Sequence, residues 1–184
     1  MSKIIEKVDR RIQRTQRSLR EALVTLSLEK GYDAITIRDI TERANVSYST
    51  FFRHYAEKDD LLAEEVKSVV HNLKTLINHS PDKSRESEGL LIFQHVAEQH
   101  AFFRVLFSSH GTSRVMRDIQ QEIAADLVQS SVFPANSLVP PEIAANHFVV
   151  TILGLIRWWL DHDMPYPIER MASIYSRLVS IPSD

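Results

Sequence analysis

The chain has 184 residues, of which 43% are hydrophobic and 25% are charged, as is typical of globular proteins and not of disordered ones. It contains no cysteine, which excludes disulfides, thiolate metal sites and cysteine nucleophiles. Residues 1–20 are charged throughout, and the most apolar stretch, residues 148–160, is shorter than a membrane span of about 20 residues. These features predict a cytoplasmic protein that does not associate with a membrane.

The net charge of −2 is unevenly distributed along the chain. Residues 1–58 carry 12 Lys and Arg against 8 Asp and Glu, whereas residues 59–184 carry 10 against 16. This asymmetry indicates that only the N-terminal part meets a polyanion such as a nucleic acid. A chance distribution explains the same numbers, so the charge alone leaves both interpretations open.

Apolar residues recur at the spacing of α-helices along most of the chain, and no run shows the sustained alternation of a β-strand. We therefore expect an all-α fold of about nine helices. The first of them carries Arg10, Arg14 and Arg17 on the face opposite its apolar stripe. The expected helices cover about residues 8–30, 37–44, 48–55, 59–77, 89–109 with a kink near residue 100, 113–129, 142–162 and 167–180.

The strongest local signal lies in residues 36–58. Thr36 provides the N-cap of a short helix, residues 45–47 form a tight turn, and Ser47 caps a second short helix. Apolar residues of both helices, such as Ile40, can pack them against the first helix at the large crossing angle of a helix-turn-helix. The outward residues of the second helix are hydroxyls, aromatics and one arginine, which suits an element placed in the major groove of DNA. A plain corner of an all-helical protein fits the same pattern and stays open at this point.

Five short runs within residues 11–62 match a known pattern in both identity and spacing. They are EKGYDA at 29–34, TIRDI at 36–40, ANVS at 44–47, TFFRHY at 50–55 and KDDLL at 58–62. With these runs the chain resembles the N-terminal domain of the TetR family of bacterial regulators. The resemblance implies a three-helix DNA-binding domain over residues 1–58 and a helical dimerisation and effector domain over residues 59–184. It also implies a repressor that binds a palindromic operator as a homodimer, needs no cofactor and is released by a small-molecule effector.

The resemblance further implies which residues contact double-stranded DNA. Thr36 would bind a phosphate through its hydroxyl and amide, and Arg38 would reach a guanine edge or a phosphate. Arg10, Arg11 and Arg14 would add nonspecific contacts. The expected DNA-binding residues are Thr36, Arg38, Ser47, Tyr48, Ser49, Thr50, Phe52, Arg53, His54 and Lys58.

Within that set, residues 48–50 are expected to face the bases, and Ser47, His54 and Lys58 are expected to contact the backbone. At the first two positions of 48–50 many family members have a cation and a glycine instead, so the operator sequence does not follow from the resemblance. Phe52 stands where a tyrosine commonly donates its hydroxyl to a phosphate. We therefore expect Phe52 to contact a thymine methyl or a sugar.

The helix expected at residues 142–162 has apolar residues on all sides, more than one packing face can bury. In the family the last two helices form the dimer interface, and Gly154 would let a partner helix approach closely. Burial of the apolar excess within one subunit is the alternative. The residues expected at the dimer interface are Phe148, Ile152, Leu155, Ile156 and Trp159.

An effector pocket is expected within the C-terminal domain, although each candidate residue also fits a plain core. No metal site is expected, because His95 and His100 do not share a helical face. No catalytic motif is present, so the chain is not expected to be an enzyme. The candidate pocket residues are Phe93, Phe102, Phe103, Phe107, Met116, His147 and Trp158.

The segment LGLIRWWLDHDM at residues 153–164 resembles one branch of the family, which includes regulators of dihydroxyacetone kinase genes. Some members of that branch act as coactivators. A coactivator or protein-interaction regulator with the same fold is therefore the alternative to a repressor.

Overall fold

The computed structural model describes residues 2–108, 112–133 and 138–179. In this part of the chain it has nine α-helices, one 3-10 helix and no strand, which confirms the expected all-α fold. The elements are α1 (Ser2–Lys30), η1 (Tyr32–Ala34), α2 (Ile37–Arg43), α3 (Tyr48–Phe52), α4 (Lys58–His79), α5 (Arg85–Glu98), α6 (His100–Ser108), α7 (Ser113–Gln129), α8 (Pro141–Asp161) and α9 (Ile168–Val179).

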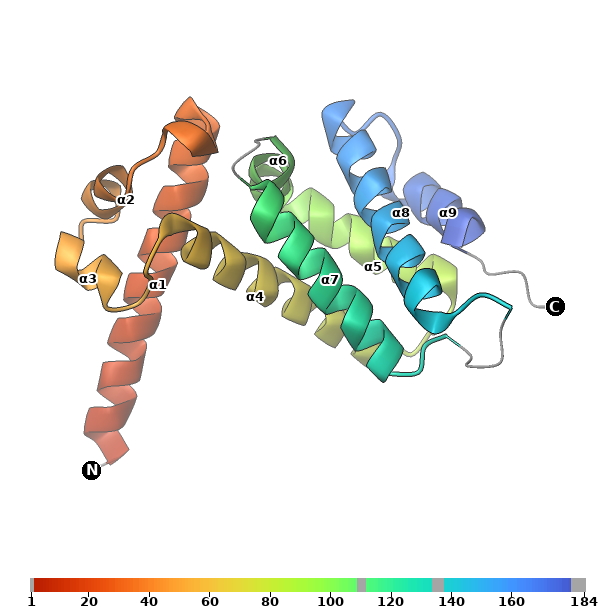
Figure 1. Cartoon of the computed structure of the whole chain (residues 1–184), viewed down its shortest axis with the longest axis horizontal. Coiled ribbons are helices and arrows are strands. Elements are labelled where there is room, and N and C mark those ends of the chain that lie inside the picture. Colours follow the sequence, from red (N-terminus) through yellow and green to blue (C-terminus); the bar gives the residue numbers. More distant parts are fainter. Residues whose placement is uncertain (1, 109–111, 134–137, 180–184) are drawn as a thin grey trace.

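The helices form two groups joined by the long helix α4 and by a contact between α1 and α6 (Figure 1). α1, α2 and α3 lie at one end of the molecule, and we call this group the head. The larger group, α5 to α9, is the body. α4 contacts α1 in the head and both α5 and α7 in the body, so it links the two groups directly.

The head is held together by apolar side chains that its three helices turn toward one another. Leu23 of α1, Ile40 of α2 and Phe51 of α3 are all buried. Tyr55 follows α3, and its ring centroid lies 5.6 Å from that of Phe51. α3 ends at Phe52 and not at Tyr55 as expected, although the amide of Tyr55 still donates a hydrogen bond to the carbonyl of Phe51 at 2.9 Å.

The body is built on a close contact between α5 and α9. Gly89 of α5 is buried against Ala172 and Tyr175 of α9. Phe93, one turn further along α5, meets Trp159 of α8 edge to face, with ring centroids 5.3 Å apart. Three helices therefore share one core, with α7 packed on the other side of α8.

Most helix limits agree with the expected ones. α7 spans the expected residues, and the expected kink near residue 100 is a break at Gln99 between α5 and α6. The largest difference is α1, which begins at Ser2 and not near residue 8. Its N-terminal part extends beyond the other two helices of the head (Figure 1).

α8 contains the most apolar stretch of the chain. By length and composition alone it could cross a membrane, with a mean hydropathy of 1.4 over its best window. A core helix of a folded protein passes the same test, so this is weak evidence. Phe148, Ile156 and Trp159 of α8 are buried in the body, so part of its apolar surface belongs to the core.

The close approach of α5 and α9 leads to a test of the packing of the body. A Cβ atom at Gly89 would lie 2.7 Å from Cδ1 of the buried Tyr175 and 3.0 Å from Cα of Ala172. Gly89→Ala should therefore lower the free energy of unfolding by about 1–3 kcal/mol, measured by urea denaturation. Gln94→Ala, on the exposed side of the same helix, is the control and should change it by less than about 0.5 kcal/mol. Equal stability of the two variants would contradict this packing.

Candidate nucleic-acid interface

Two short capped helices, α2 and α3, meet at a tight turn in the head. The hydroxyl of Thr36 accepts a hydrogen bond from the amide of Asp39 at 3.2 Å, and the Asp39 carboxylate accepts one from the amide of Thr36 at 2.8 Å. Ser47 caps α3 by accepting a hydrogen bond from the amide of Thr50. In the turn, Asn45 has a φ of 53°, a left-handed conformation that asparagine tolerates. These local features determine where α2 ends and where α3 begins, as a helix-turn-helix requires.

The polar side chains of α3 bind one another. The hydroxyl oxygen of Ser47 lies 3.1 Å from that of Ser49 and 2.7 Å from that of Thr50. Arg53 donates a hydrogen bond from Nη2 to the Thr50 hydroxyl at 3.0 Å. The hydroxyls are therefore engaged before any ligand arrives, and the guanidinium group is held close to the helix.

Two aromatic rings project from the same helix. Tyr48 and Phe52 are 55% and 47% exposed, and their rings meet edge to face with centroids 5.0 Å apart. The Phe52 ring also lies 5.5 Å from that of Phe51, which is fully buried. The outer surface of α3 thus presents the rings of Tyr48 and Phe52, which pack against each other, and Phe52 also packs on the buried Phe51. The guanidinium group of Arg53 lies on the same helix.

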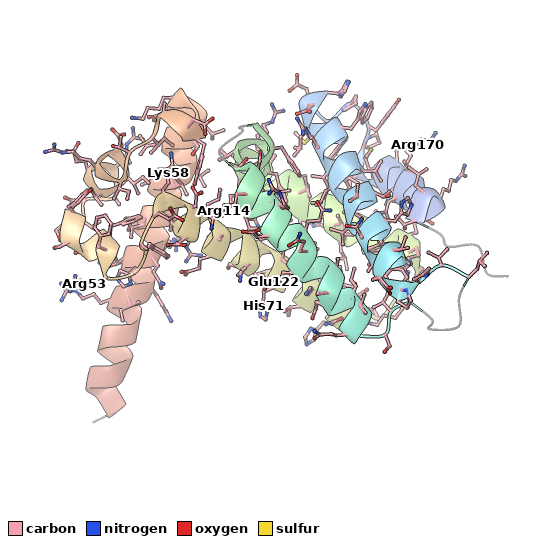
Figure 2. All side chains as sticks on the ribbon, viewed as in Figure 1. Arg53, Lys58, His71, Arg114, Glu122 and Arg170 are labelled. Atoms are coloured by element: carbon pink, nitrogen blue, oxygen red, sulfur yellow. The ribbon has the colours of Figure 1, made fainter. Side chains whose placement is uncertain are left out.

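Arg20 of the head is paired with Glu65 of α4, and four other cations whose side chains the structure describes are bound in ion pairs with carboxylates of the head itself. These pairs are Arg17–Glu21, Lys30–Asp39, Arg38–Glu42 and Arg43–Glu29. By contrast, Arg11 and Arg14 of α1 are exposed and have no ion pair among the described residues. Arg53 lies at the outer end of α3, on the side away from the body (Figure 2). The uncompensated positive charge of the head is therefore on α1 and at α3.

Asp39 accepts hydrogen bonds from both the amide and the hydroxyl of Thr36. Its Oδ2 accepts hydrogen bonds from the Thr36 amide at 2.8 Å and hydroxyl at 2.7 Å, and it forms an ion pair with Lys30 at 2.9 Å. The hydrogen bond from Lys30, followed by those from Thr36, holds the pKa of Asp39 well below its usual value. The expected phosphate contact of Thr36 stays a prediction; in the free protein Asp39 engages both of the donors that it would use.

Lys58, the first residue of α4, is engaged inside the protein. Its Nζ donates hydrogen bonds to the carbonyl oxygens of Tyr32 at 2.9 Å and Ile35 at 3.0 Å, and it lies 4.5 Å from the centroid of the Tyr32 ring. The Tyr32 hydroxyl donates to Oδ1 of Asp59 at 2.5 Å. Burial, followed by this bond to Asp59, raises the pKa of Tyr32. We call these four residues the Lys58 clamp; Figure 2 shows Lys58 where the head meets α4.

The Lys58 clamp gives its lysine a structural role. Two of the three ammonium protons hold the start of α4 to the carbonyl oxygens of Tyr32 and Ile35, so Lys58 is a positioning residue, and its expected phosphate contact stays a prediction. Sequence reasoning missed its partners Tyr32 and Asp59, although both lie in runs that carry the family resemblance. Those runs identify the residues without revealing that they pair across the head.

Comparison with known proteins identifies the fold. Residues 19–64 match the family described as bacterial regulatory proteins, tetR family. Residues 89–180 match a TetR-type family described as transcriptional regulator C-terminal region. The chain belongs to the TetR family. The matched families and the curated relatives are transcriptional regulators of the helix-turn-helix type and not enzymes.

Individual relatives of this TetR-family regulator are distant. It is 25% identical over 187 residues to the uncharacterized HTH-type regulator YxbF of Bacillus subtilis, covering 96% of this chain and 47% of the relative. It is 27% identical over 70 residues to IcaR, the negative regulator of the biofilm operon icaADBC in Staphylococcus epidermidis, covering 38% of each chain. The regulator thus spans about half the length, or less, of such curated relatives. The solved structure of Lin0861 from Listeria innocua has the same fold, with a TM-score of 0.74, 21% identity and coverage of 91% of this chain and 90% of that one.

The residues expected to line an effector pocket do not lie together in the structure. His147 and Trp158 are exposed on α8, and the Trp158 ring stacks on that of His162 with centroids 4.4 Å apart. For these two the expectation is wrong, because side chains on the outer surface of α8 do not line an interior pocket. The others lie within the core of the body or are packed against it: Phe93, Phe102, Phe103, Phe107 and Met116.

Two clefts lie beside α4, and neither is lined by an expected pocket residue. One, of about 280 Å³, lies between α4 and α7, with Val70 and Ile123 among its apolar lining. An ion pair between Lys67 and Glu122, at 3.0 Å, joins the same two helices (Figure 2). The other, of about 440 Å³, lies between α1 and α4. The regulator therefore has space on both sides of the helix that connects head and body.

The expected dimer residues fall into two groups. Phe148, Ile156 and Trp159 are buried within the subunit, and Trp159 is only 2% exposed. For these three, burial within one subunit accounts for the apolar side chain, because the core of the body already covers it. Ile152 and Leu155 are half-buried and retain some outward surface.

A different arc of α8 is exposed. It carries Ile143, Val150 and Trp158, each more than one-third exposed. Gly154 lies on the same arc, and a Cβ atom added there would meet nothing within 4 Å. The arc is mixed: its apolar residues lie beside the exposed His147 and the exposed ion pair between Arg157 and Asp161.

The Lys58 clamp leads to a prediction about the stability of this TetR-family regulator. Lys58→Met keeps the aliphatic stem beside Tyr32 but removes the donors to two carbonyl oxygens, so it should lower the free energy of unfolding by about 1–3 kcal/mol. Lys67→Met, on the same helix, removes an exposed ion pair and should cost less than about 1 kcal/mol. Urea denaturation of both variants gives the comparison. If Lys58→Met were the less damaging of the two, the clamp would not hold α4.

Proposed function

We propose that the regulator is a repressor that binds a palindromic operator as a homodimer and is released when an effector binds its C-terminal domain. The observation that carries this proposal is the open position of α3. Tyr48 and Phe52 project from the head into solvent, and α3 lies at the outer end of the molecule (Figure 1). A recognition helix needs this uncovered outer face to enter the major groove. As a regulator of transcription, the protein would act in the cytoplasm, where a bacterial chromosome lies.

The contacts with DNA would come from the second half of the helix-turn-helix and from the cations beside it. Arg11 and Arg14, which have no ion pair in the described part of the chain, would meet phosphates of the flanking backbone. Thr36 and Lys58 would position α2 and α4 through the contacts described above. The residues that we propose reach DNA directly are Arg38, Ser47, Tyr48, Ser49, Thr50, Phe52, Arg53 and His54.

Repression and release are supported by the position of α4. Since this helix contacts both α1 and α7, a ligand that shifts α4 against the body would also move the head. We place the functional boundary at the start of α4, with a DNA-binding domain over residues 1–58 and a dimerisation and effector domain over residues 59–184. The name of IcaR, a negative regulator, supports repression over activation. A coactivator of the branch suggested by residues 153–164 would bind a protein partner and no operator.

DNA binding is tested by fluorescence anisotropy with duplexes from the region upstream of the protein's own gene. Tyr48→Ala should weaken binding about tenfold, because it removes an exposed ring of α3 at little cost to the core. Leu76→Ala, at an apolar residue of α4 with similar exposure, is the matched control and should leave binding unchanged. If the native chain binds no duplex, the repressor proposal fails; if the Tyr48→Ala chain binds as tightly as the native chain, Tyr48 does not contact DNA. A chain that binds no DNA but captures another regulator would support the coactivator.

The homodimer would form through the exposed arc of α8. Ile143, Val150 and Trp158 provide an apolar surface, and Gly154 lets a second helix come close. Leu178 of α9 is also exposed and would extend the same surface. Two copies joined here would present two heads to two half-sites of a palindrome.

The proposed interface predicts the effect of a buried charge. Val150→Glu would place a carboxylate against the partner helix, so the dimer should dissociate at least tenfold more readily in analytical ultracentrifugation. Leu76→Glu places the same charge on an exposed apolar position of α4 and should leave the dimer intact. A native chain that sediments as a monomer would reject the homodimer. A Val150→Glu chain that stays dimeric would reject this interface.

A further inference from the structure

The outer face of α3 carries two large aromatic rings beside a few small polar groups. Tyr48 and Phe52 are the two large exposed side chains of this five-residue helix. They are fixed by edge-to-face contacts, with each other at 5.0 Å and, for Phe52, with the buried Phe51 at 5.5 Å. The two rings therefore form a preorganised apolar surface that loses little conformational freedom when a ligand covers it.

The hydrogen-bonding groups beside these rings are already engaged with one another. Ser47, Ser49 and Thr50 share their hydroxyls, and Arg53 directs one guanidinium nitrogen to Thr50. These bonds use part of the hydrogen-bonding capacity beside the rings, so a base edge would compete with them, whereas contact with the rings requires no such exchange. The geometry thus places two uncovered rings beside polar groups that are already partly engaged.

The major groove displays one apolar group on its base edges, the C5 methyl of thymine. We propose that Tyr48 and Phe52 form a reading site for pyrimidine C5 methyl groups, so that the operator half-site is selected for thymines opposite α3. This inference rests on the proposed function, because it requires α3 to enter the major groove. 5-Methylcytosine carries the same methyl group, and the experiment separates the methyl from the base that bears it.

The test uses the full chain and duplexes that it selects from a random library. In the best duplex, each thymine is replaced in turn by deoxyuridine, which keeps base pairing and removes only the methyl. Burial of one methyl is worth about 0.8 kcal/mol, so the dissociation constant should rise about fourfold at each contacted thymine. At the same positions, a G·C pair should bind about fourfold more weakly than the same pair with 5-methylcytosine.

The two rings are then linked to the methyl by substitution. Phe52→Ala and Tyr48→Ala should bind more weakly than the native chain and lose the response to deoxyuridine at the positions that each ring contacts. Leu76→Ala should keep the full response. Circular dichroism of the variants checks that the helical fold is retained, and the deoxyuridine series on the native chain is decisive without any variant.

The outcomes separate the two proposals. Tight binding to a selected duplex that is indifferent to every deoxyuridine would overturn methyl reading and leave the DNA-binding function in place. A deoxyuridine response that persists in both ring variants would overturn the assignment to Tyr48 and Phe52. Failure to select any duplex would overturn the proposed function, and methyl reading with it.

Discussion

One ammonium group holds the first turn of α4 to the head. Lys58 donates hydrogen bonds to the carbonyl oxygens of Tyr32 and Ile35, and its ammonium group lies over the Tyr32 ring. The hydroxyl of that ring donates a hydrogen bond to Asp59. Helix α4 thus begins in contact with the chain that leads out of α1. Because α4 continues without interruption into contacts with α5 and α7, the orientation of α3 is connected to the packing of the body.

The local parts of the fold could be predicted because their causes are local. The capping pair of Thr36 and Asp39, and the cap from Ser47, lie within a few residues of the helix starts that they stabilise. The Lys58 clamp could not be predicted in this way, since its bonds join residues 26 and 23 positions apart. Sequence spacing indicates which residues share a helical face, but not which carbonyl a lysine from another helix will reach.

The C-terminal half shows the limit of periodicity. The apolar residues of α8 occupy its whole circumference, so no stripe distinguishes the side that faces α5 and α9 from the side that faces solvent. Trp158 and Trp159 are neighbours in sequence and have opposite environments, one 42% exposed and the other 2% exposed. Only the packing of Trp159 against Phe93 decides between them. Three of the residues expected at the interface, Phe148, Ile156 and Trp159, therefore face the core of the body instead.

The shortness of α3 limits how much information one head can extract from DNA. Five residues rise about 7.5 Å, the length of about two base-pair steps. A word of two or three base pairs recurs by chance roughly every 16 to 64 positions, while a genome offers about a million competing sites or more. To distinguish its operator among so many sites, the protein has to combine the contacts of two heads at a fixed separation. The stiffness of the DNA between the two contacted segments adds to this discrimination. For such a protein the spacing between two short half-sites matters as much as their base sequence.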